Sequence, residues 1–150
     1  MRKIMFTMCA AYVFACCTAQ AQQKPCTPAE QDQVGKEADS FRTWDALYKS
    51  YKQFKHCRNN AEAEEGYSES KARILADHWE TLPRLAELIK IDSEFGTFVG
   101  LDSTMRMDDV TRIRENALHH CPAGLSVLCT KLRKDAESAI ADDAAVKKHG

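Results

Sequence analysis

The sequence predicts an all-α protein, a single small bundle of about five to six helices. Apolar residues recur at spacings of three, four and seven in several segments, which is typical of helices that bury one face. No segment shows sustained alternation of apolar and polar residues, and no Asn-Gly pair indicates a β-hairpin. Four cysteines outside the N-terminal leader predict that disulfides staple the bundle.

Residues 1–21 are predicted to be a signal peptide. Arg2 and Lys3 precede an uncharged apolar stretch, and small residues at Ala19 and Ala21 suit a signal peptidase that cuts after Ala21. The apolar run is shorter than the about 20 residues that span a bilayer. We therefore expect a periplasmic or secreted protein without a stable membrane span.

A lipoprotein signal ending at Cys16 is the alternative, but Phe14 stands where a lipobox prefers a small residue, so we expect no lipid anchor. The remaining residues, 22–150, are predicted to form one helical domain with its core at about 27–140 and a polar C-terminal end. They keep 19 of the 21 basic residues beside 22 acidic ones, a net charge of 19 − 22 = −3. Scattered charges without a basic stripe argue against a nucleic-acid partner.

The first two helices have clear start signals. Thr27 is a predicted N-cap, followed by Pro28 at the first helical position and Glu30 as the reciprocal capping-box residue. A second helix begins after Ser40 or Thr43. Its apolar stripe contains Trp44, Leu47, Tyr48, Tyr51 and Phe54.

Residues 59–70, with the sequence NNAEAEEGYSES, are predicted to form an acidic connecting loop, because Gly66 and the polar residues interrupt the apolar periodicity. Ser68 or Ser70 then caps the next helical segment. Pro83 should kink or split that segment, since proline lacks a backbone donor and clashes with the carbonyl four residues back. The segment's apolar residues are Leu75, Trp79, Leu82, Leu85, Leu88 and Ile89.

Three more helices complete the prediction. Asp92 caps a short helix, and residues 107–121 form a firmer one that Pro122 ends. The last helix begins near Ala123 and places apolar residues along one face as far as Ile140, after which the polar end frays.

The cysteines left after the leader are Cys26, Cys57, Cys121 and Cys129, and an even number in an exported chain implies a disulfide framework with three connectivities. We favour Cys57–Cys121, because it closes a loop of over sixty residues, and such a loop is worth about 4 kcal/mol in the chain-entropy model. Cys26 would then pair with Cys129. A local Cys121–Cys129 bridge is the competitor, but eight helical residues separate Cα atoms by about 12 Å, so the chain must fold back at Gly124.

A metal site is the alternative use of the His-Cys pairs. His56, Cys57, Cys121 and either His119 or His120 would supply a Cys₂His₂ set. Adjacent residues on a helix point about 100° apart, and the zinc-finger spacing is absent, so we expect no metal. An unpaired catalytic thiol is equally disfavoured in an oxidising compartment.

Two other features have a functional and a structural interpretation. The acidic run of Glu62, Glu64, Glu65 and Glu69 could face a basic cleft on a protein partner, or it could be a solvated connector. The aromatic residues could line a ligand groove, but their helical spacing favours a core. These aromatic residues are Trp44, Tyr48, Tyr51 and Trp79.

The chain resembles uncharacterised small exported bacterial helical proteins that contain cysteines. The likeness lies in FKHC, EGYSES, WETLPRLAELIK and HHCPAGLSVLC, between Trp44 and Lys134. It implies a helical, cystine-bearing fold and no particular activity. The chain is also loosely similar to periplasmic immunity proteins of type VI secretion systems, which are short, helical, exported and often disulfide-bonded, and which plug the active site of a cell-wall amidase effector. No motif residue maps one to one, so no site is transferred.

We therefore expect an exported non-enzymatic protein that binds or inhibits a protein partner in the periplasm, as an immunity protein does. A structural or stress-related cell-envelope protein without a dedicated partner is the alternative, followed by a helical enzyme. The sequence contains no G-x-S-x-G, no H-E-x-x-H and no phosphate-binding loop, so no catalytic residue and no cofactor is assigned.

Overall fold

The computed structural model describes residues 24–57, 61–102 and 104–149, and this part of the chain contains helices and no strand. The all-α prediction is confirmed. The elements are α1 (Pro28–Ala38), α2 (Trp44–Phe54), the 3₁₀-helix η1 (Lys55–Cys57), α3 (Ala61–Asp77), the 3₁₀-helix η2 (Trp79–Thr81), α4 (Leu82–Ile91), α5 (Ser93–Phe98), α6 (Met107–His119) and α7 (Ser126–His149). None of the described helices combines the length and the apolarity that a membrane crossing requires.

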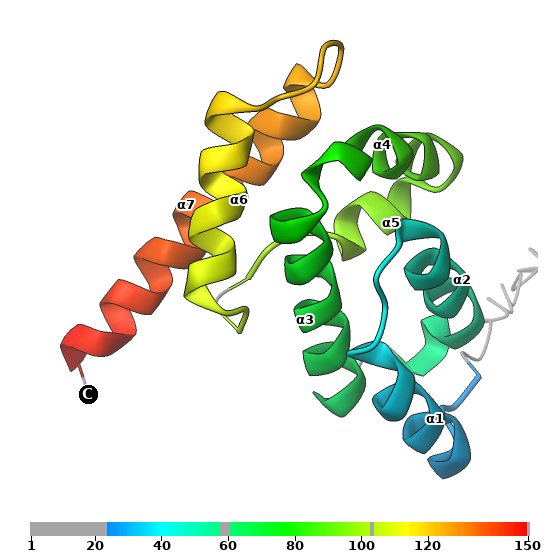
Figure 1. Ribbon diagram of the computed structural model, residues 1–150. Helices are drawn as coiled ribbons and strands as arrows, with labels where there is room; N and C mark the ends of the chain where they lie inside the picture. Colours follow the sequence, from blue (N-terminus) through cyan, green and yellow to red (C-terminus); the bar gives the residue numbers. More distant parts are fainter. Residues whose placement is uncertain (1–23, 58–60, 103, 150) are drawn as a thin grey trace, which may run out of the picture.

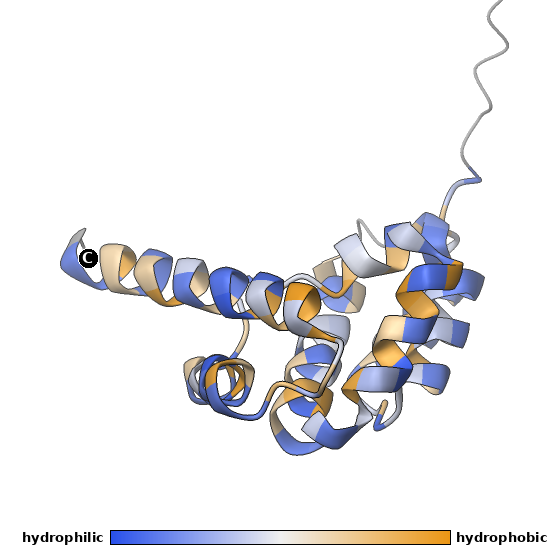
Figure 2. Cartoon of the chain, turned by 90° about the horizontal axis from the view of Figure 1, so that it is seen from above, coloured by the Kyte–Doolittle hydropathy of each residue, from blue (hydrophilic) through white to orange (hydrophobic). Residues whose placement is uncertain are grey.

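Helix α3 lies at the centre of the bundle and contacts α1 on one side and α6 on the other (Figure 1). Helices α6 and α7 form an antiparallel pair, while α4 packs on α5 beside α2. The C-terminal part of α7 extends beyond the other helices (Figure 2). One face of α3 therefore meets α1, and another meets α6.

Local capping signals are confirmed at three helix starts. Thr27 and Glu30 form the capping box of α1, with Glu30 N donating to Thr27 Oγ1 at 3.3 Å and Thr27 N donating to Glu30 Oε2 at 3.0 Å. Thr43, rather than Ser40, caps α2. Asp92 caps α5 by accepting from the amide of Glu94 at 3.1 Å.

The predicted acidic loop is wrong over residues 61–70, because α3 is one continuous helix from Ala61 to Asp77, and residues 59 and 60 lie outside the described residues. Its buried face near α1 consists of small residues, Ala63, Gly66 and Ser70, which hydropathy does not mark as a core stripe. A Cβ atom at Gly66 would lie 2.7 Å from the Cβ of Ala38, so glycine lets the two helices approach closely. Ser68 and Ser70 are therefore interior helix residues and not caps, and the Ser70 hydroxyl donates to the carbonyl of Ala38.

The predicted split at Pro83 is confirmed: α3 ends at Asp77, η2 intervenes, and Pro83 lies in the first turn of α4, where its missing N–H costs no helix bond. The predicted frayed C-terminus is wrong, since α7 continues past Ile140 to His149. A pair at spacing i, i+4, Asp143 with Lys147 at 2.8 Å, supports the exposed final turns.

The aromatic residues predicted for the core lie there. Trp44, Tyr51 and Trp79 are buried, and Tyr48 is partly buried against the same cluster. Both indole N–H groups have acceptors: Trp44 donates to Thr81 Oγ1 at 3.0 Å, and Trp79 donates to the carbonyl of His120 at 2.8 Å. The two tryptophans therefore join elements that are distant in the sequence.

The preferred disulfide pairing, Cys57–Cys121 with Cys26–Cys129, is wrong. The bridges are Cys26–Cys57, with Cα atoms 4.9 Å apart, and Cys121–Cys129, with Cα atoms 6.0 Å apart. The chain does fold back after Cys121, because the Leu125 amide donates to the Pro122 carbonyl at 3.1 Å and Gly124 adopts a φ of 80°. This turn brings Cys121 to the start of α7, which the loop-length argument could not foresee.

Candidate functional site

The four predicted partner-binding glutamates lie on two different faces of α3. Glu62, Glu65 and Glu69 are spaced by three, four and seven residues and share the face beside α1. Glu64 lies on another face, toward α5. The sequence grouped these residues as one loop, whereas the helix separates them.

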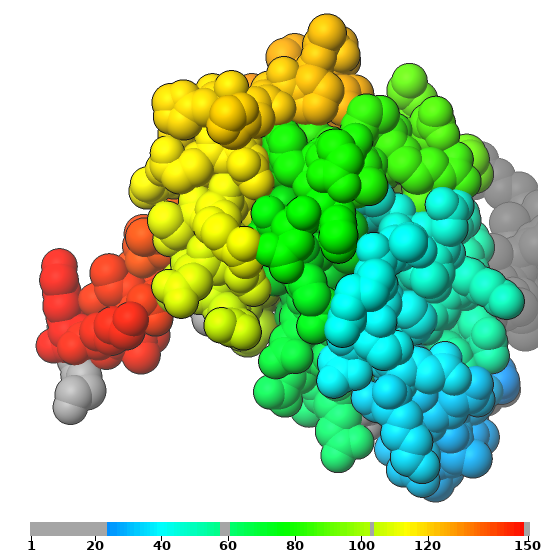
Figure 3. Space-filling model, viewed as in Figure 1, coloured from blue at the N-terminus to red at the C-terminus, as the bar shows by residue number. Residues whose placement is uncertain are grey.

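Glu62, Glu65 and Glu69 line a surface hollow of about 340 Å³ between α1 and α3, together with Gly35, Asp39 and Gly66. We call this the acidic hollow. The space-filling view shows α3, in green, exposed at the surface between α1 and α6 (Figure 3). Four carboxylates line the acidic hollow, those of Asp39, Glu62, Glu65 and Glu69. None of them forms an ion pair with a residue that the structure describes. Two arginines lie beside the hollow and donate to the backbone carbonyl of Asp39: Arg42 at 3.1 Å, and Arg73, which also donates to Ser70 Oγ.

A second pocket, of about 590 Å³, lies between α3 on one side and α5 with the segment that follows it on the other. We call it the Lys71 pocket. Its carboxylates come from Glu64, Glu94 and Asp102, and its apolar lining comes from Tyr67, Phe98 and Leu101. Lys55 pairs with Glu94 at the rim, whereas the charges of Asp102 and Glu64 act on Lys71.

Lys71 is the most unusual side chain of this pocket, with only 5% of its surface exposed. Its Nζ donates to the Phe98 carbonyl at 3.0 Å and lies 5.0 Å from the centre of the Phe98 ring. Burial lowers the pKa of Lys71, and the charges of Asp102 and Glu64 offset this shift in part. The ammonium group thus braces the C-terminal end of α5 against α3.

Sequence reasoning missed Lys71, although a signal was present. Lys71 follows Tyr67 by four residues and precedes Leu75 by four, so it lies on the buried stripe of α3. Tyr67 is itself fixed there, since its hydroxyl is 2.7 Å from Ser50 Oγ. Burial raises the pKa of Tyr67, while this hydrogen bond acts in the opposite direction.

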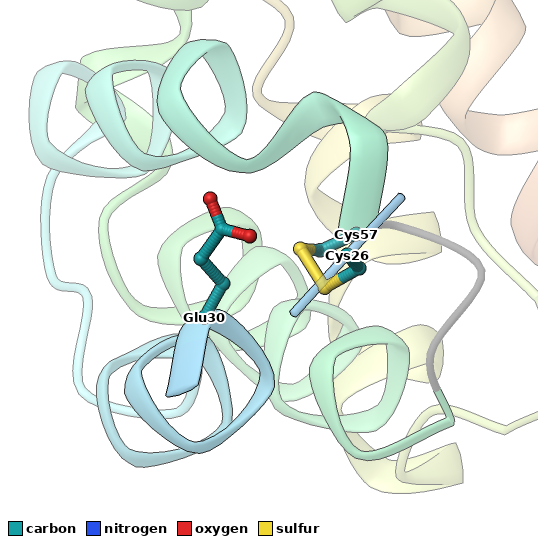
Figure 4. A group of neighbouring side chains, drawn as sticks. All are labelled: Cys26, Glu30 and Cys57. Carbon is teal, nitrogen blue, oxygen red and sulfur yellow. A yellow bond between two sulfur atoms is a disulfide. The ribbon is translucent and has the colours of Figure 1, made fainter. Parts of the chain in front are cut away.

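One group of metal-capable side chains comes together among the described residues: Cys26, Glu30 and Cys57 (Figure 4). Both sulfur atoms belong to a disulfide, and so neither is a thiolate ligand. Glu30 serves the capping box and also lies 2.6 Å from Lys24 Nζ, which together hold the pKa of its carboxyl well below its usual range. We assign this group to the N-terminal staple of the fold.

The Cys₂His₂ alternative loses its sulfur ligands in the same way. Cys57 bonds to Cys26, and Cys121 bonds to Cys129. His56 follows α2 and has its Nε2 atom 3.2 Å from Glu30 Oε1, whereas His120 is the C-cap of α6. The two histidines therefore belong to separate local contacts.

No family model, no curated protein and no solved structure matches this chain. The interpretation of the site therefore depends on its own geometry, in which the acidic hollow is suited to hold cationic groups.

Proposed function

We propose that the protein is an exported, non-enzymatic periplasmic protein that binds or inhibits a protein partner through the acidic hollow. The observation that carries this proposal is that the carboxylates of Asp39, Glu62, Glu65 and Glu69 line one hollow. None of them forms an ion pair with a described residue. Their chemistry selects a partner surface rich in lysine and arginine. An immunity-like inhibitor of a toxin with a basic cleft is the concrete form.

Electrostatics supports the choice of surface. Like charges at helical spacing repel and cost about 0.2–0.5 kcal/mol per pair. Several carboxylates elsewhere have a cationic partner, as in Asp45–Arg84 and Asp77–Arg112, both at 2.6 Å. An uncompensated acidic concavity attracts a basic partner over a long range and orients it during encounter.

Export is supported by two independent features. The predicted signal peptide lies outside the described residues, and its evidence is the charge and apolar pattern of the sequence. The two disulfides are typical of proteins that mature in an oxidising compartment.

The test compares proteins captured from periplasmic extract by three forms of the chain. These are the wild type, the hollow variant Glu62→Gln/Glu65→Gln/Glu69→Gln, and a control variant with the same change in charge. The control replaces exposed carboxylates elsewhere: Glu80→Gln, Glu137→Gln and Asp142→Asn.

We expect a basic protein that the wild type and the control variant retain, that the hollow variant loses, and that added salt releases. Retention of the same proteins by the hollow variant would contradict the proposal. An envelope-stress phenotype of a deletion strain, together with no charge-dependent capture, would favour the structural alternative.

A further inference from the structure

A third surface feature has the opposite charge and lies on the other side of α5. It is a groove of about 410 Å³ between α4, α5 and the start of α7. Its apolar walls come mainly from Ile89, Leu125, Val127 and Leu128. We call it the apolar groove.

Two lysines and no carboxylate line this groove, whereas carboxylates line the acidic hollow, the Lys71 pocket and a hollow between α3 and α6 in the described part of the chain. Lys90 forms no ion pair with a described residue. Lys131 pairs with Asp135, but Lys131 remains 47% exposed, and an exposed pair of this kind is worth at most about 1 kcal/mol. The groove therefore offers positive charge beside an apolar surface.

Two structural features fix the walls of the groove. A Cβ atom at Gly96 would lie 3.0 Å from Ile89 Cγ2, so the glycine permits α5 to pack closely against Ile89 on α4. The opposite wall begins at the turn that contains Gly124, and the Cys121–Cys129 disulfide ties this turn to the first turn of α7. The wall formed by Leu125 and Leu128 is thus covalently fixed before any ligand arrives.

Val127 adds an exposed apolar side chain to the rim of the groove. It is 85% exposed in the first turn of α7, beside other apolar side chains of the groove. Isolated exposed apolar residues are ordinary, but Val127 borders a concave surface that is itself lined by Ile89, Leu125 and Leu128. The volume lies within the range of about 300–1,000 Å³ that is typical of small-molecule sites.

We propose that the apolar groove binds a free single-chain aliphatic anion, a medium-chain fatty acid. The alkyl chain lies against Ile89, Leu125 and Leu128, and the carboxylate meets Lys90 or Lys131. This site is separate from the acidic hollow and does not depend on the partner proposed for it.

Calorimetric titration tests the proposal with decanoate as the probe. Decanol and decyltrimethylammonium keep the chain and change the head group, and octanoate shortens the chain by two methylenes. We expect saturable 1:1 binding of decanoate below about 1 mM, and binding at least about tenfold tighter than that of octanoate, because each buried methylene contributes about fourfold in affinity. Decyltrimethylammonium should bind at least about tenfold more weakly than decanoate.

Two matched substitutions locate the site. Val127→Glu places a carboxylate at the groove, and Val146→Glu makes the same change at a position 72% exposed near the far end of α7. Both positions are on the surface, so neither change should disturb the fold. Val127→Glu should weaken decanoate binding at least about tenfold, while Val146→Glu and the hollow variant should leave it unchanged.

Equal affinity for the three head groups, absence of saturable decanoate binding, or equal effects of the two valine substitutions would each overturn the proposal. A peptide or protein that occupied the groove while decanoate did not bind would overturn it as well.

Discussion

The close contact between α1 and α3 predicts that replacing Gly66 with alanine destabilises the protein. The added Cβ would lie 2.7 Å from Ala38 Cβ and 3.1 Å from the backbone nitrogen of Asp39. These atoms belong to the end of α1 and cannot rotate away, so the two helices must separate. The same separation would widen the acidic hollow, which Gly66 lines.

Helix propensity and overpacking change the free energy of unfolding of Gly66→Ala in opposite directions. Glycine to alanine within a helix gains about 1 kcal/mol in propensity, while overpacking of a tight contact costs about 1–3 kcal/mol. Loss of the hydrogen bond from Ser70 to the Ala38 carbonyl would add about 1 kcal/mol to the cost. We therefore expect Gly66→Ala to lower the free energy of unfolding by about 1–3 kcal/mol.

Gly35→Ala is the matched control, since it makes the same chemical change on the facing helix. A Cβ at Gly35 would meet only the Glu62 side chain, with Oε2 at 3.4 Å and Cβ at 3.8 Å, which are ordinary contacts. The propensity gain should therefore prevail and stabilise the protein by about 0.5–1 kcal/mol. Urea unfolding of the oxidised protein, followed by tryptophan fluorescence, measures both variants. A Gly66→Ala protein as stable as the wild type would refute the proposed packing of α1 on α3.

Three further outcomes follow from local contacts. Thr27→Ala should lower the free energy of unfolding by about 1 kcal/mol in the same assay, because it removes the capping box of α1. An unchanged free energy would show that the capping box does not stabilise the protein. Burial lowers the pKa of Lys71 in the folded chain, so the unfolded chain binds more protons than the folded chain as the pH approaches about 10.4. The free energy of unfolding of the wild type, relative to that of Lys71→Met, should therefore rise from neutral toward alkaline pH. A difference between the two proteins that does not change with pH would contradict this. Peptide mapping should recover Cys26 linked to Cys57 and Cys121 linked to Cys129, and a Cys57–Cys121 peptide would disprove the pairing. Serine replacement of the first pair should lower the free energy of unfolding by about 1 kcal/mol more than replacement of the second, because the sequence separations are 31 and 8.

The features that could be predicted from sequence are those that nearby residues determine. The capping box at Thr27 and Glu30, the cap at Asp92 and the break before Pro83 each depend on backbone groups a few residues away. The 3, 4, 7 spacing of large apolar residues likewise identified the buried face of α2.

The errors arise where tertiary contact outweighs composition. Helix α3 buries Ala63, Gly66 and Ser70 against α1, and these residues have too little apolar surface to appear as a core stripe. The disulfide pairing depended on the turn at Gly124, whereas loop-closure entropy considers only length.

The candidate site could be predicted only in part, because tertiary structure decides which acidic residues lie together. The density of glutamates indicated a charged surface, but only the helical register of α3 separates Glu64 from Glu62, Glu65 and Glu69. The contribution of Asp39 comes from the packing of the end of α1 beside α3 and has no signal in the local sequence.

The most direct test of the proposed function is the association rate of the captured partner at two ionic strengths. The wild type and the control variant Glu80→Gln/Glu137→Gln/Asp142→Asn should associate quickly at low salt and more slowly at high salt. The hollow variant Glu62→Gln/Glu65→Gln/Glu69→Gln should associate more slowly and with a smaller salt dependence, because the charges that steer encounter are removed. Equal rates and equal salt slopes for the three proteins would show that the acidic hollow is not the recognition surface.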